Sequence, residues 1–333
     1  MFYFYCDASK EIGFGHLQRC ILIAQYLKTA LGKLIAFIET SATVKNHLNL
    51  REIDTITTIE ALPPNQTIIF DVAHEKNLSS PEKCCQLINH VHQLGHRIIF
   101  IDGLGNHRFN PQSNTMPRVD LIVTPYLGSL EQPFLPYKKW LSGKDFILVD
   151  PKLKEMNIRS SDSVSSTLVT MGGTDKFNIT LQVLNALRTN PHVHINVVLG
   201  SFFSYELKSS IQKLTVKFPN FHLIDSPITL LPYYRQTDLV VCSTGITTYE
   251  VLAAGLPSIQ ISPTITHSDN FAHFDQCMVH LGYYKTLSDT DVQTVFEDLL
   301  TDKTQRAKIA AQAKQMIDGD GLKRVALALL MVG

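Results

Sequence analysis

The first residues whose types and spacing could carry out chemistry lie in the stretch "DASKEIGFGHLQRC", directly after the first apolar run. Gly13 and Gly15 let the backbone approach a phosphate or a sugar, because glycine has no Cβ. His16 and Arg19 lie three residues apart, so they share one face of a helix. A histidine can take a proton near neutral pH, and an arginine can stabilise an anion. We therefore predict His16 and Arg19 as catalytic residues and Gly13 and Gly15 as substrate-binding residues.

The alternative for this stretch is a glycine-rich turn between a strand and a helix with an incidental histidine. The pattern G-x-G-x-x-R lacks the third glycine of the dinucleotide-binding fingerprint. On the helix expected from about 15 to 29, His16 and Arg19 face largely away from the apolar stripe and toward the crevice above the sheet. Asp7, which directly follows the first strand, completes the set of catalytic candidates. The apolar stripe consists of Leu17, Ile21, Ala24 and Leu27.

A second candidate site lies in "TLVTMGGTDKFNIT", where a strand runs into a glycine-rich turn and a helix. The N-terminus of a helix attracts anions through its unpaired N–H groups and the helix dipole. We predict a nucleotide-binding turn here. The alternative is an ordinary turn in which Asp175 caps the helix. The candidate residues are Gly172, Gly173, Thr174, Asp175 and Asn178.

The third candidate site lies in "VVCSTGITTYEVLAAGLPSIQIS", and it has the same order of strand, turn and helix. Ser243, Thr244, Gly245 and Thr248 offer hydroxyls and backbone N–H groups that suit a diphosphate. Glu250, a turn further along the helix, can accept hydrogen bonds from both hydroxyls of a ribose. Two phosphate-binding turns in one half of the chain support each other, so this half is predicted to bind a nucleotide.

Two aspartates close apolar strands at their carboxyl ends, Asp71 in "TIIFD" and Asp102 in "RIIFID". Carboxylates at that position in an open α/β sheet often belong to a site, although capping of the next segment is an equal alternative. We predict Asp71 and Asp102, together with Asn270, as substrate-binding residues. His92 and His96 lie four residues apart, but no third ligand lies nearby, so we predict a solvated helix face and no metal site.

The spacing of apolar runs predicts the elements that must position these residues. Short β-branched or aromatic runs alternate with helical stretches along both halves of the chain, which is typical of parallel strands joined by helical crossovers. The fold class is therefore α/β, with two doubly wound, Rossmann-like parallel-sheet domains that face a cleft. The predicted strands are 2–6, 34–39, 67–71, 97–102, 119–124, 166–171, 195–200, 221–225, 238–242 and 257–262.

The length of 333 residues fits two domains. We predict an N-terminal sugar-binding and catalytic domain over 1–150 and a C-terminal nucleotide-binding domain over 151–315. A final helix over 316–333 is expected to pack back on the first domain. The polar loop 103–117 is long enough to be functional or disordered.

The composition excludes several classes of function. With 30 basic and 30 acidic residues, the chain lacks the positive field that attracts nucleic acid. No apolar run reaches the roughly 18 residues of a membrane span, and the N-terminal run is too short for a signal peptide. The six cysteines lack disulfide-like spacing and are expected to be reduced in a cytoplasmic protein. The oligomeric state stays open, and a monomer is plausible.

The motifs "IGFGH" with Arg19, "MGGTD" with Asn178, and "STGITTYE", in this order, resemble those of the hydrolase family of pseudaminic acid biosynthesis. That family releases UDP from UDP-2,4-diacetamido-2,4,6-trideoxy-β-L-altropyranose. It is similar to a spore-coat polysaccharide protein family and has the glycosyltransferase type B fold. The resemblance implies that His16 activates water, that the second and third turns bind UDP, and that no metal or other cofactor is needed.

The chain departs from this family on the sugar side. Asp71 is followed by "VAHEK" where the family has His-Tyr-Gly, and Asp102 is followed by Gly103 where the family often has a second aspartate. The family has an asparagine near the end of the following strand, and this chain has "IVTPY" there without one. The identity of the sugar is therefore less supported than the nucleotide.

The leading hypothesis is a metal-independent UDP-sugar hydrolase that acts in nonulosonic acid or surface polysaccharide biosynthesis. It would release UDP and free sugar by C–O cleavage with inversion at C1, with His16 as general base. The first alternative is a glycosyltransferase of the same fold that uses an acceptor hydroxyl in place of water. The second alternative is a non-catalytic protein that binds a nucleotide-sugar.

Overall fold

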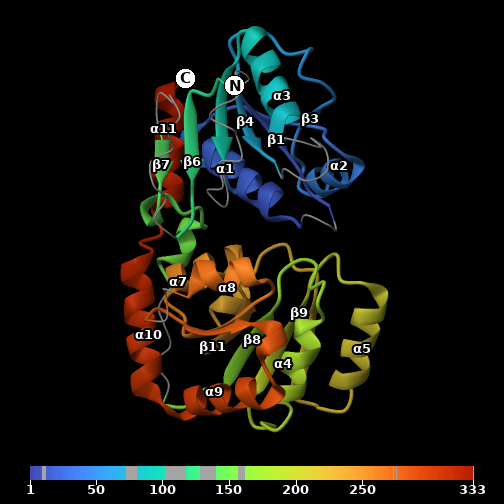
Figure 1. The fold of residues 1–333 in the computed structure, drawn as a ribbon, viewed down its shortest axis with the longest axis vertical. Coiled ribbons are helices and arrows are strands. Elements are labelled where there is room, and N and C mark those ends of the chain that lie inside the picture. The colour runs from blue at the N-terminus through green and yellow to red at the C-terminus, as the bar shows by residue number, and fades with distance from the viewer. Residues whose placement is uncertain are drawn as a thin grey trace. The chain divides into compact units, whose positions relative to one another are not determined.

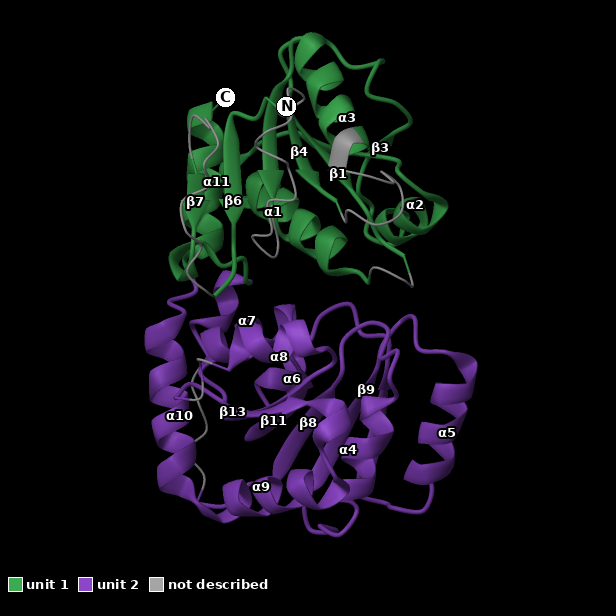
Figure 2. Cartoon of the chain, viewed as in Figure 1, with its two compact units in different colours: residues 1–149, 320–333 green, residues 150–319 purple. Residues whose placement is uncertain are grey.

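The computed structural model describes residues 1–9, 13–72, 81–101, 118–127, 140–156, 162–272, 274 and 276–332. The chain divides into two compact units (Figure 2). Unit 1 contains residues 1–149 and 320–333, and unit 2 contains residues 150–319. Asp102 and the polar loop 103–117 lie outside the described residues.

Unit 1 contains a parallel sheet of seven strands in the order β3-β2-β1-β4-β5-β6-β7 (Figure 1). Strands β2, β4 and β6 are buried along their whole length, and their residues are almost all apolar, as expected of a parallel sheet covered by helices on both faces. The strands are β1 (Phe2–Cys6), β2 (Ile35–Ile38), β3 (Thr55–Ile56), β4 (Thr67–Asp71), β5 (Arg97–Ile101), β6 (Leu121–Thr124) and β7 (Trp140–Ser142). The helices are α1 (Gly15–Leu31), α2 (Ala42–Asn49), α3 (Pro81–Gln93), the 3-10 helix η1 (Lys144–Phe146) and α11 (Gly321–Val332).

Unit 2 contains a parallel sheet of six strands in the order β10-β9-β8-β11-β12-β13. The strands are β8 (Ser166–Thr170), β9 (His194–Leu199), β10 (Phe221–Asp225), β11 (Leu239–Ser243), β12 (Ser258–Ser262) and β13 (Val279–Tyr283). The helices are α4 (Ile179–Leu187), α5 (Tyr205–Thr215), α6 (Leu231–Tyr234), α7 (Ile246–Ala254), α8 (Ile265–Phe271), α9 (Asp289–Thr301), α10 (Lys303–Met316) and the 3-10 helices η2 (Pro151–Leu153) and η3 (Tyr284–Thr286). The predicted fold class, two doubly wound parallel-sheet domains, is confirmed.

The order of strands places one topological switch point in each sheet. In unit 1 the chain moves from β1 to one side of the sheet and from β4 to the other, and β1 and β4 are neighbours. In unit 2 the same relation holds for β8 and β11. Ligands of open α/β sheets bind where the loops diverge, at the carboxyl ends of two such strands. The first candidate site follows β1, and the second and third follow β8 and β11.

The C-terminal helix α11 belongs to unit 1, although the chain reaches it from unit 2. It packs on η1 and α1. A Cβ at Gly321 would lie 2.2 Å from the carbonyl oxygen of Ile147, so only glycine fits at this contact. Arg324 donates to the carbonyl oxygen of Asp145 (3.0 Å), and Arg97 of β5 donates to that of Val332 (3.0 Å). The helix is therefore fixed to unit 1 along its length.

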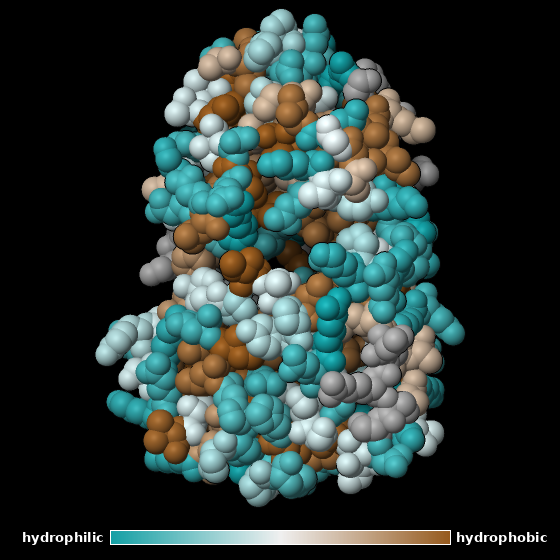
Figure 3. Space-filling view, turned by 180° about the vertical axis from the view of Figure 1, so that it is seen from behind, coloured by the Kyte–Doolittle hydropathy of each residue, from teal (hydrophilic) through white to brown (hydrophobic). Residues whose placement is uncertain are grey.

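The surface mixes polar and apolar side chains. On the face drawn in Figure 3, hydrophobic residues lie in small groups among hydrophilic ones. Within the part of the chain that the structure describes, every helix is too short or too polar to cross a membrane. All six cysteines are buried and none forms a disulfide.

Candidate active site

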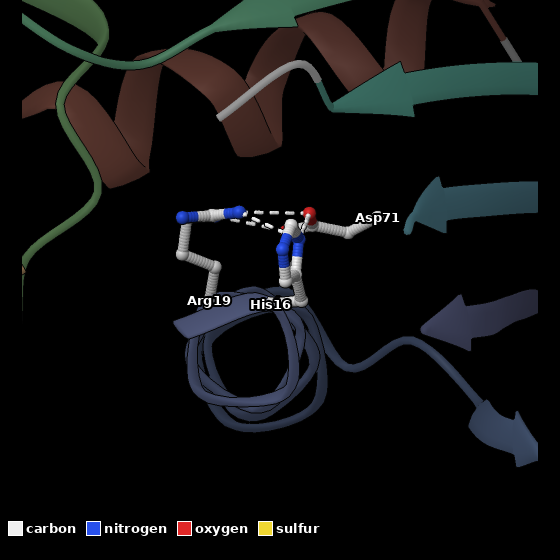
Figure 4. Close-up of polar contacts among 3 residues, drawn as sticks. All are labelled: His16, Arg19 and Asp71. Carbon is white, nitrogen blue, oxygen red and sulfur yellow. Dashed lines mark hydrogen bonds and ion pairs between the residues drawn. The ribbon is translucent and has the colours of Figure 1, made fainter. Parts of the chain in front are cut away.

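Three polar side chains, an imidazole, a guanidinium and a carboxylate, meet at the switch point of unit 1 (Figure 4). His16 and Arg19 extend from the first turns of α1, and Asp71 ends β4. The Nδ1 atom of His16 lies 2.6 Å from Oδ1 of Asp71. Arg19 grips both carboxylate oxygens, with Nε donating to Oδ2 (2.9 Å) and Nη2 donating to Oδ1 (2.8 Å). A histidine and a carboxylate 55 residues apart in the sequence are thus paired.

The Asp71 carboxylate is completely buried, with an exposed fraction of 0%. Burial by itself would raise the pKa of Asp71, but the charges and hydrogen bonds of Arg19 and His16 lower it below its ordinary value. An ionised carboxylate only accepts hydrogen bonds, so the network assigns the proton to Nδ1 of His16 and leaves Nε2 as the atom that can take a further proton. Arg19 Nη2 lies 3.0 Å from Nδ1 of His16, because both nitrogens contact Oδ1 of Asp71.

The amphipathic pattern of α1 explains how this helix presents its polar residues. Leu17, Ile21 and Ala24 face the core and are buried. The side chains of His16 and Arg19 keep exposed fractions of 22% and 13%. Among the described residues, no group accepts a hydrogen bond from the backbone N–H of Gly15 or His16. This end of the helix therefore combines unpaired donors with an imidazole.

The other residues predicted for unit 1 do not all join this cluster. Asp7 is 1% exposed, and its backbone N–H donates to the carbonyl oxygen of Asp71, so the structure does not present its carboxylate to a ligand. Gly13 pairs with Ser9 in an isolated antiparallel bridge that shapes the turn before α1. Asp71 was predicted to bind substrate, but its buried oxygens are occupied by His16 and Arg19.

In unit 2, the glycine-rich turn after β8 is held by a close approach to the end of β9. A Cβ at Gly200 would lie 2.5 Å from the carbonyl oxygens of both Gly172 and Gly173, so only glycine fits there. Phe202 also donates its N–H to the Gly173 carbonyl (3.0 Å). On its other side, the turn lies next to Ser243, whose Oγ would be 3.8 Å from a Cβ at Gly172. The second and third candidate sites are thus neighbours.

The N-terminus of α4 is closed by a carboxylate of the chain itself. Asp175 accepts hydrogen bonds from the backbone N–H groups of Ile179 and Thr180, both at 2.9 Å. Burial raises the pKa of Asp175, and these hydrogen bonds oppose the shift. The first N–H groups of α4 are therefore not open to a phosphate, and Asp175 has the capping role that was the alternative interpretation. Asn178, the residue before α4, is exposed.

The N-terminus of α7 is different, because no carboxylate of the described residues caps it. Thr248 accepts a hydrogen bond from the N–H of Gly245 (3.1 Å) and donates to the Gln260 side chain (2.6 Å). It is 0% exposed, so it shapes the turn and presents no atom to a ligand, which differs from its predicted role. The backbone N–H groups of Ile246 and Thr247 have no acceptor among the described residues.

A buried polar chain supports the same turn. The hydroxyl of Thr244 lies 3.1 Å from that of Ser262, which lies 2.8 Å from Nε2 of His280. Ser262 and Gln260 lie two residues apart on β12, so both point to the same face, and both are fully buried. The alternation in "SIQIS" is the sequence signal for this support, and the sequence analysis missed it.

Glu250 lies on α7 beyond the turn, and its Oε2 accepts a hydrogen bond from the hydroxyl of Tyr234 (2.8 Å). Tyr234 is buried, whereas Glu250 is partly buried. Burial raises the pKa of Glu250 to about 7, Tyr234 opposes this shift, and Asp150 adds to it. A carboxyl that titrates near neutral pH is characteristic of functional sites. Tyr234 had no signal in the sequence that tied it to Glu250.

Two further predicted substrate-binding residues remain. Asn270 lies on α8 in unit 2 and is partly exposed. Asp102 lies outside the described residues.

The prediction of a solvated helix face is wrong for His96. Helix α3 ends at Gln93, and His96 lies beyond it with an exposed fraction of 3%. The ring of His96 accepts a hydrogen bond from the backbone N–H of Gln66 (3.3 Å). Nowhere in the described ranges do three His, Cys, Asp or Glu side chains come together as a metal site.

A cavity of about 500 Å³ lies elsewhere in unit 2. Ser166 and His194, which line it, begin β8 and β9. The cavity therefore lies toward the opposite end of the strands from the glycine-rich turns, and it contains none of the predicted site residues. The remaining lining residues are Asn196, Tyr233 and Gln236.

Comparison with known sequences finds distant relatives, and no family model matches the chain. The uncharacterized protein MJ1062 of Methanocaldococcus jannaschii is 25% identical over 279 residues, which cover 76% of this chain and 54% of that protein. The spore coat polysaccharide biosynthesis protein SpsG of Bacillus subtilis is 21% identical over 194 residues, which cover 56% of this chain and 57% of that protein. The chain spans about half the length of the curated relatives it matches.

Solved structures resemble the chain over nearly its whole length. MurG of Acinetobacter baumannii has a TM-score of 0.60 and 13% identity, and 99% of each chain is covered. HepE of Anabaena, in complex with UDP and glucose, has a TM-score of 0.60 and 12% identity over 98% of each chain. UDP-GlcNAc 2-epimerase of Neisseria meningitidis, bound to UDP-GlcNAc, has a TM-score of 0.59 and 15% identity over 100% of each chain. The two Rossmann-like domains therefore have the glycosyltransferase type B fold.

Proposed function

We propose that this protein hydrolyses a UDP-sugar, with His16 as the general base and unit 2 as the nucleotide-binding part. The observation that carries the proposal is the 2.6 Å contact between His16 Nδ1 and Asp71 Oδ1. A buried carboxylate on Nδ1 fixes the orientation of the imidazole and directs Nε2 outward, which is how an oriented base is built in many hydrolytic enzymes. The Arg19 guanidinium keeps that carboxylate ionised and in place.

The proposed reaction is a single displacement at C1 of the sugar. His16 Nε2 takes a proton from a water molecule while the water oxygen forms a bond to C1 of the sugar. The bond between C1 and the UDP oxygen breaks, and UDP leaves with the electron pair. A single displacement of this kind inverts the configuration at C1. The uncapped N–H groups at the start of α7 and the Ser243 hydroxyl stabilise the charge on the departing diphosphate.

The proposal also draws on the relatives. HepE and the epimerase are described with UDP or a UDP-sugar, and SpsG is described as a spore coat polysaccharide biosynthesis protein. By this analogy the product enters surface polysaccharide or nonulosonic acid biosynthesis. A pseudaminic acid precursor is the sugar that the sequence motifs favour.

A glycosyltransferase is the second candidate, and the likeness to MurG favours it. In that case His16 takes the proton of an acceptor hydroxyl in place of water, and the same groups stabilise UDP. The two candidates therefore differ only in the nucleophile.

Incubation with UDP-sugars in ¹⁸O-labelled water tests the proposal. UDP-2,4-diacetamido-2,4,6-trideoxy-β-L-altropyranose and UDP-GlcNAc are incubated without an acceptor, and the products are analysed by mass spectrometry. We expect free sugar that carries the label and UDP that does not. The His16→Ala variant should lose at least about 100-fold in rate. UDP release that requires an added acceptor would favour the transferase, and an unchanged rate in His16→Ala would refute the role of His16.

A further inference from the structure

Tyr234 and Glu250 form a polar contact near the predicted nucleotide-binding turns that the proposed reaction does not use. The two residues come from α6 and α7, and the hydroxyl of Tyr234 donates to Oε2 of Glu250 at 2.8 Å. Tyr234 is 2% exposed, so its ring is fixed by packing. A fixed donor can hold a flexible glutamate in one orientation.

Glu250 has acceptor capacity left for a ligand. Its Oε1 has no hydrogen-bond partner among the described residues, and the side chain is only partly buried. Glu250 lies five residues after Gly245, which corresponds to about 7.5 Å along the helix axis. In a nucleotide, the ribose hydroxyls stand at a comparable distance from the diphosphate, so a diphosphate at the start of α7 brings the ribose toward Glu250.

We propose that Tyr234 is a positioning residue that makes the site selective for ribonucleotides, because it holds Glu250 so that the carboxylate accepts from the 2′- and 3′-hydroxyls of the ribose. This inference rests on the proposed function, since it assumes that unit 2 binds a nucleotide at α7. It goes further in stating that a deoxyribonucleotide is a poor ligand. A missing 2′-hydroxyl leaves one hydrogen bond to the Glu250 carboxylate unmade, which disfavours a deoxyribonucleotide.

The same geometry links nucleotide binding to a proton. The pKa of Glu250 is raised to about 7 by burial, and the groups that act on it are Tyr234 from α6 and Asp150 before η2. Cys242 of β11 also faces it. Helix α10 packs on α7. Its Arg306 donates to main-chain carbonyl oxygens and is not among the groups that shift the pKa of Glu250. Two ribose hydroxyls stabilise the ionised form, so nucleotide binding below about pH 7 releases a proton from Glu250, and the affinity rises with pH up to that value.

Isothermal titration of the full chain with UDP and with 2′-deoxy-UDP tests the inference. In the wild type we expect UDP to bind at least tenfold more tightly than 2′-deoxy-UDP. Tyr234→Phe keeps the ring and removes the donor, and it should reduce this ratio to about threefold or less. Tyr233→Phe is the matched control, because Tyr233 is the neighbouring tyrosine of α6 and lines the separate cavity, and it should leave the ratio unchanged. Melting temperatures report whether each variant is folded.

A pH series supplies a readout that a purely structural role would not move. UDP binding at pH 6, measured in two buffers of different ionisation enthalpy, should release a proton, and binding at pH 8 should not. Because the Tyr234 hydroxyl lowers the pKa of Glu250, Tyr234→Phe should move the midpoint to higher pH, and Glu250→Gln should abolish the proton release. UDP binding with an unchanged ratio in Tyr234→Phe would overturn this inference alone. Absence of any UDP binding would overturn the proposed function and this inference together.

Discussion

At the scale of single residues, the charge on Asp71 decides what His16 can do. A carboxylate with no exposed surface is stable only because Arg19 and His16 compensate for the lost hydration. The pair differs from a surface ion pair, which is screened by water and contributes little. The proposed general base needs both residues, because the Asp71 carboxylate orients the His16 imidazole.

The substitution Asp71→Asn tests this pairing. Asparagine keeps the shape but can donate to Nδ1, which favours the wrong tautomer of His16, and we expect the rate of UDP-sugar cleavage to fall about 10²- to 10⁴-fold. If the two residues act as a unit, the double variant Asp71→Asn/His16→Ala should be no slower than His16→Ala alone. The control is Asp54→Asn, which removes an exposed carboxylate of the same unit and should leave the rate unchanged.

The acid stability of Asp71→Asn supplies a second readout for the same variant. The folded pKa of Asp71 is lowered, so its contribution to the free energy of unfolding is complete above about pH 4 and is lost as the pH falls through the folded value. Urea unfolding between pH 3 and 7 should therefore show a shallower acid decline in Asp71→Asn than in the wild type. Additive losses of rate in the double variant, together with equal acid declines, would contradict the pairing.

At the scale of elements, two helices that follow glycine-rich turns differ at their N-termini. The carboxylate of Asp175 occupies the first N–H groups of α4, whereas those of α7 stay open. The glycine-rich turn before α4 therefore has another use, which is to bring its backbone beside Ser243. The close contact of Gly200 with the carbonyls of Gly172 and Gly173 sets that position.

The substitution Gly200→Ala tests the importance of this contact. Its methyl group would meet two backbone carbonyls, so the turn must move, and we expect a loss of about 1–3 kcal/mol in the free energy of unfolding. If the turn contributes to nucleotide binding, the affinity for UDP should fall as well. Ser201→Ala changes the exposed neighbouring residue and is the control. Wild-type stability in Gly200→Ala, by chemical denaturation, would show that the turn adapts at no cost.

In the whole molecule, the chain returns to unit 1 only after it has passed through unit 2. The helix α11 belongs to unit 1, and Gly321 allows its first turn to touch the backbone of Ile147. The packing of unit 1 therefore depends on residues 320–333, which follow unit 2 in the sequence.

The substitution Gly321→Ala should therefore destabilise unit 1 selectively. We expect faster amide hydrogen exchange in α1, η1 and α11, which are in contact, and little change in β8 to β13. Lys323→Ala alters an exposed residue of the same helix and serves as the control. Equal effects on both units, measured by hydrogen exchange with mass spectrometry, would contradict the assignment of α11 to unit 1.

The fold class could be predicted from the sequence, because each buried parallel strand is a short apolar run and the apolar residues of each crossover helix repeat every three to four positions. The sequence also predicted three glycine-rich turns as candidate sites, since glycines and hydroxyls after a strand suit a phosphate or a sugar. Short elements such as β3 and β7 were not predicted, because two or three residues carry no periodic signal.

Which of these residues contact one another could not be predicted from the sequence. His16 meets Asp71 because β1 and β4 are neighbours in the sheet, and Glu250 meets Tyr234 because α6 and α7 pack together. The tertiary structure also shows that Asp175 caps the helix that follows it, α4. The physical reason is that strand order and helix packing bring distant residues within 3 Å of each other, and local patterns carry no information about such pairings.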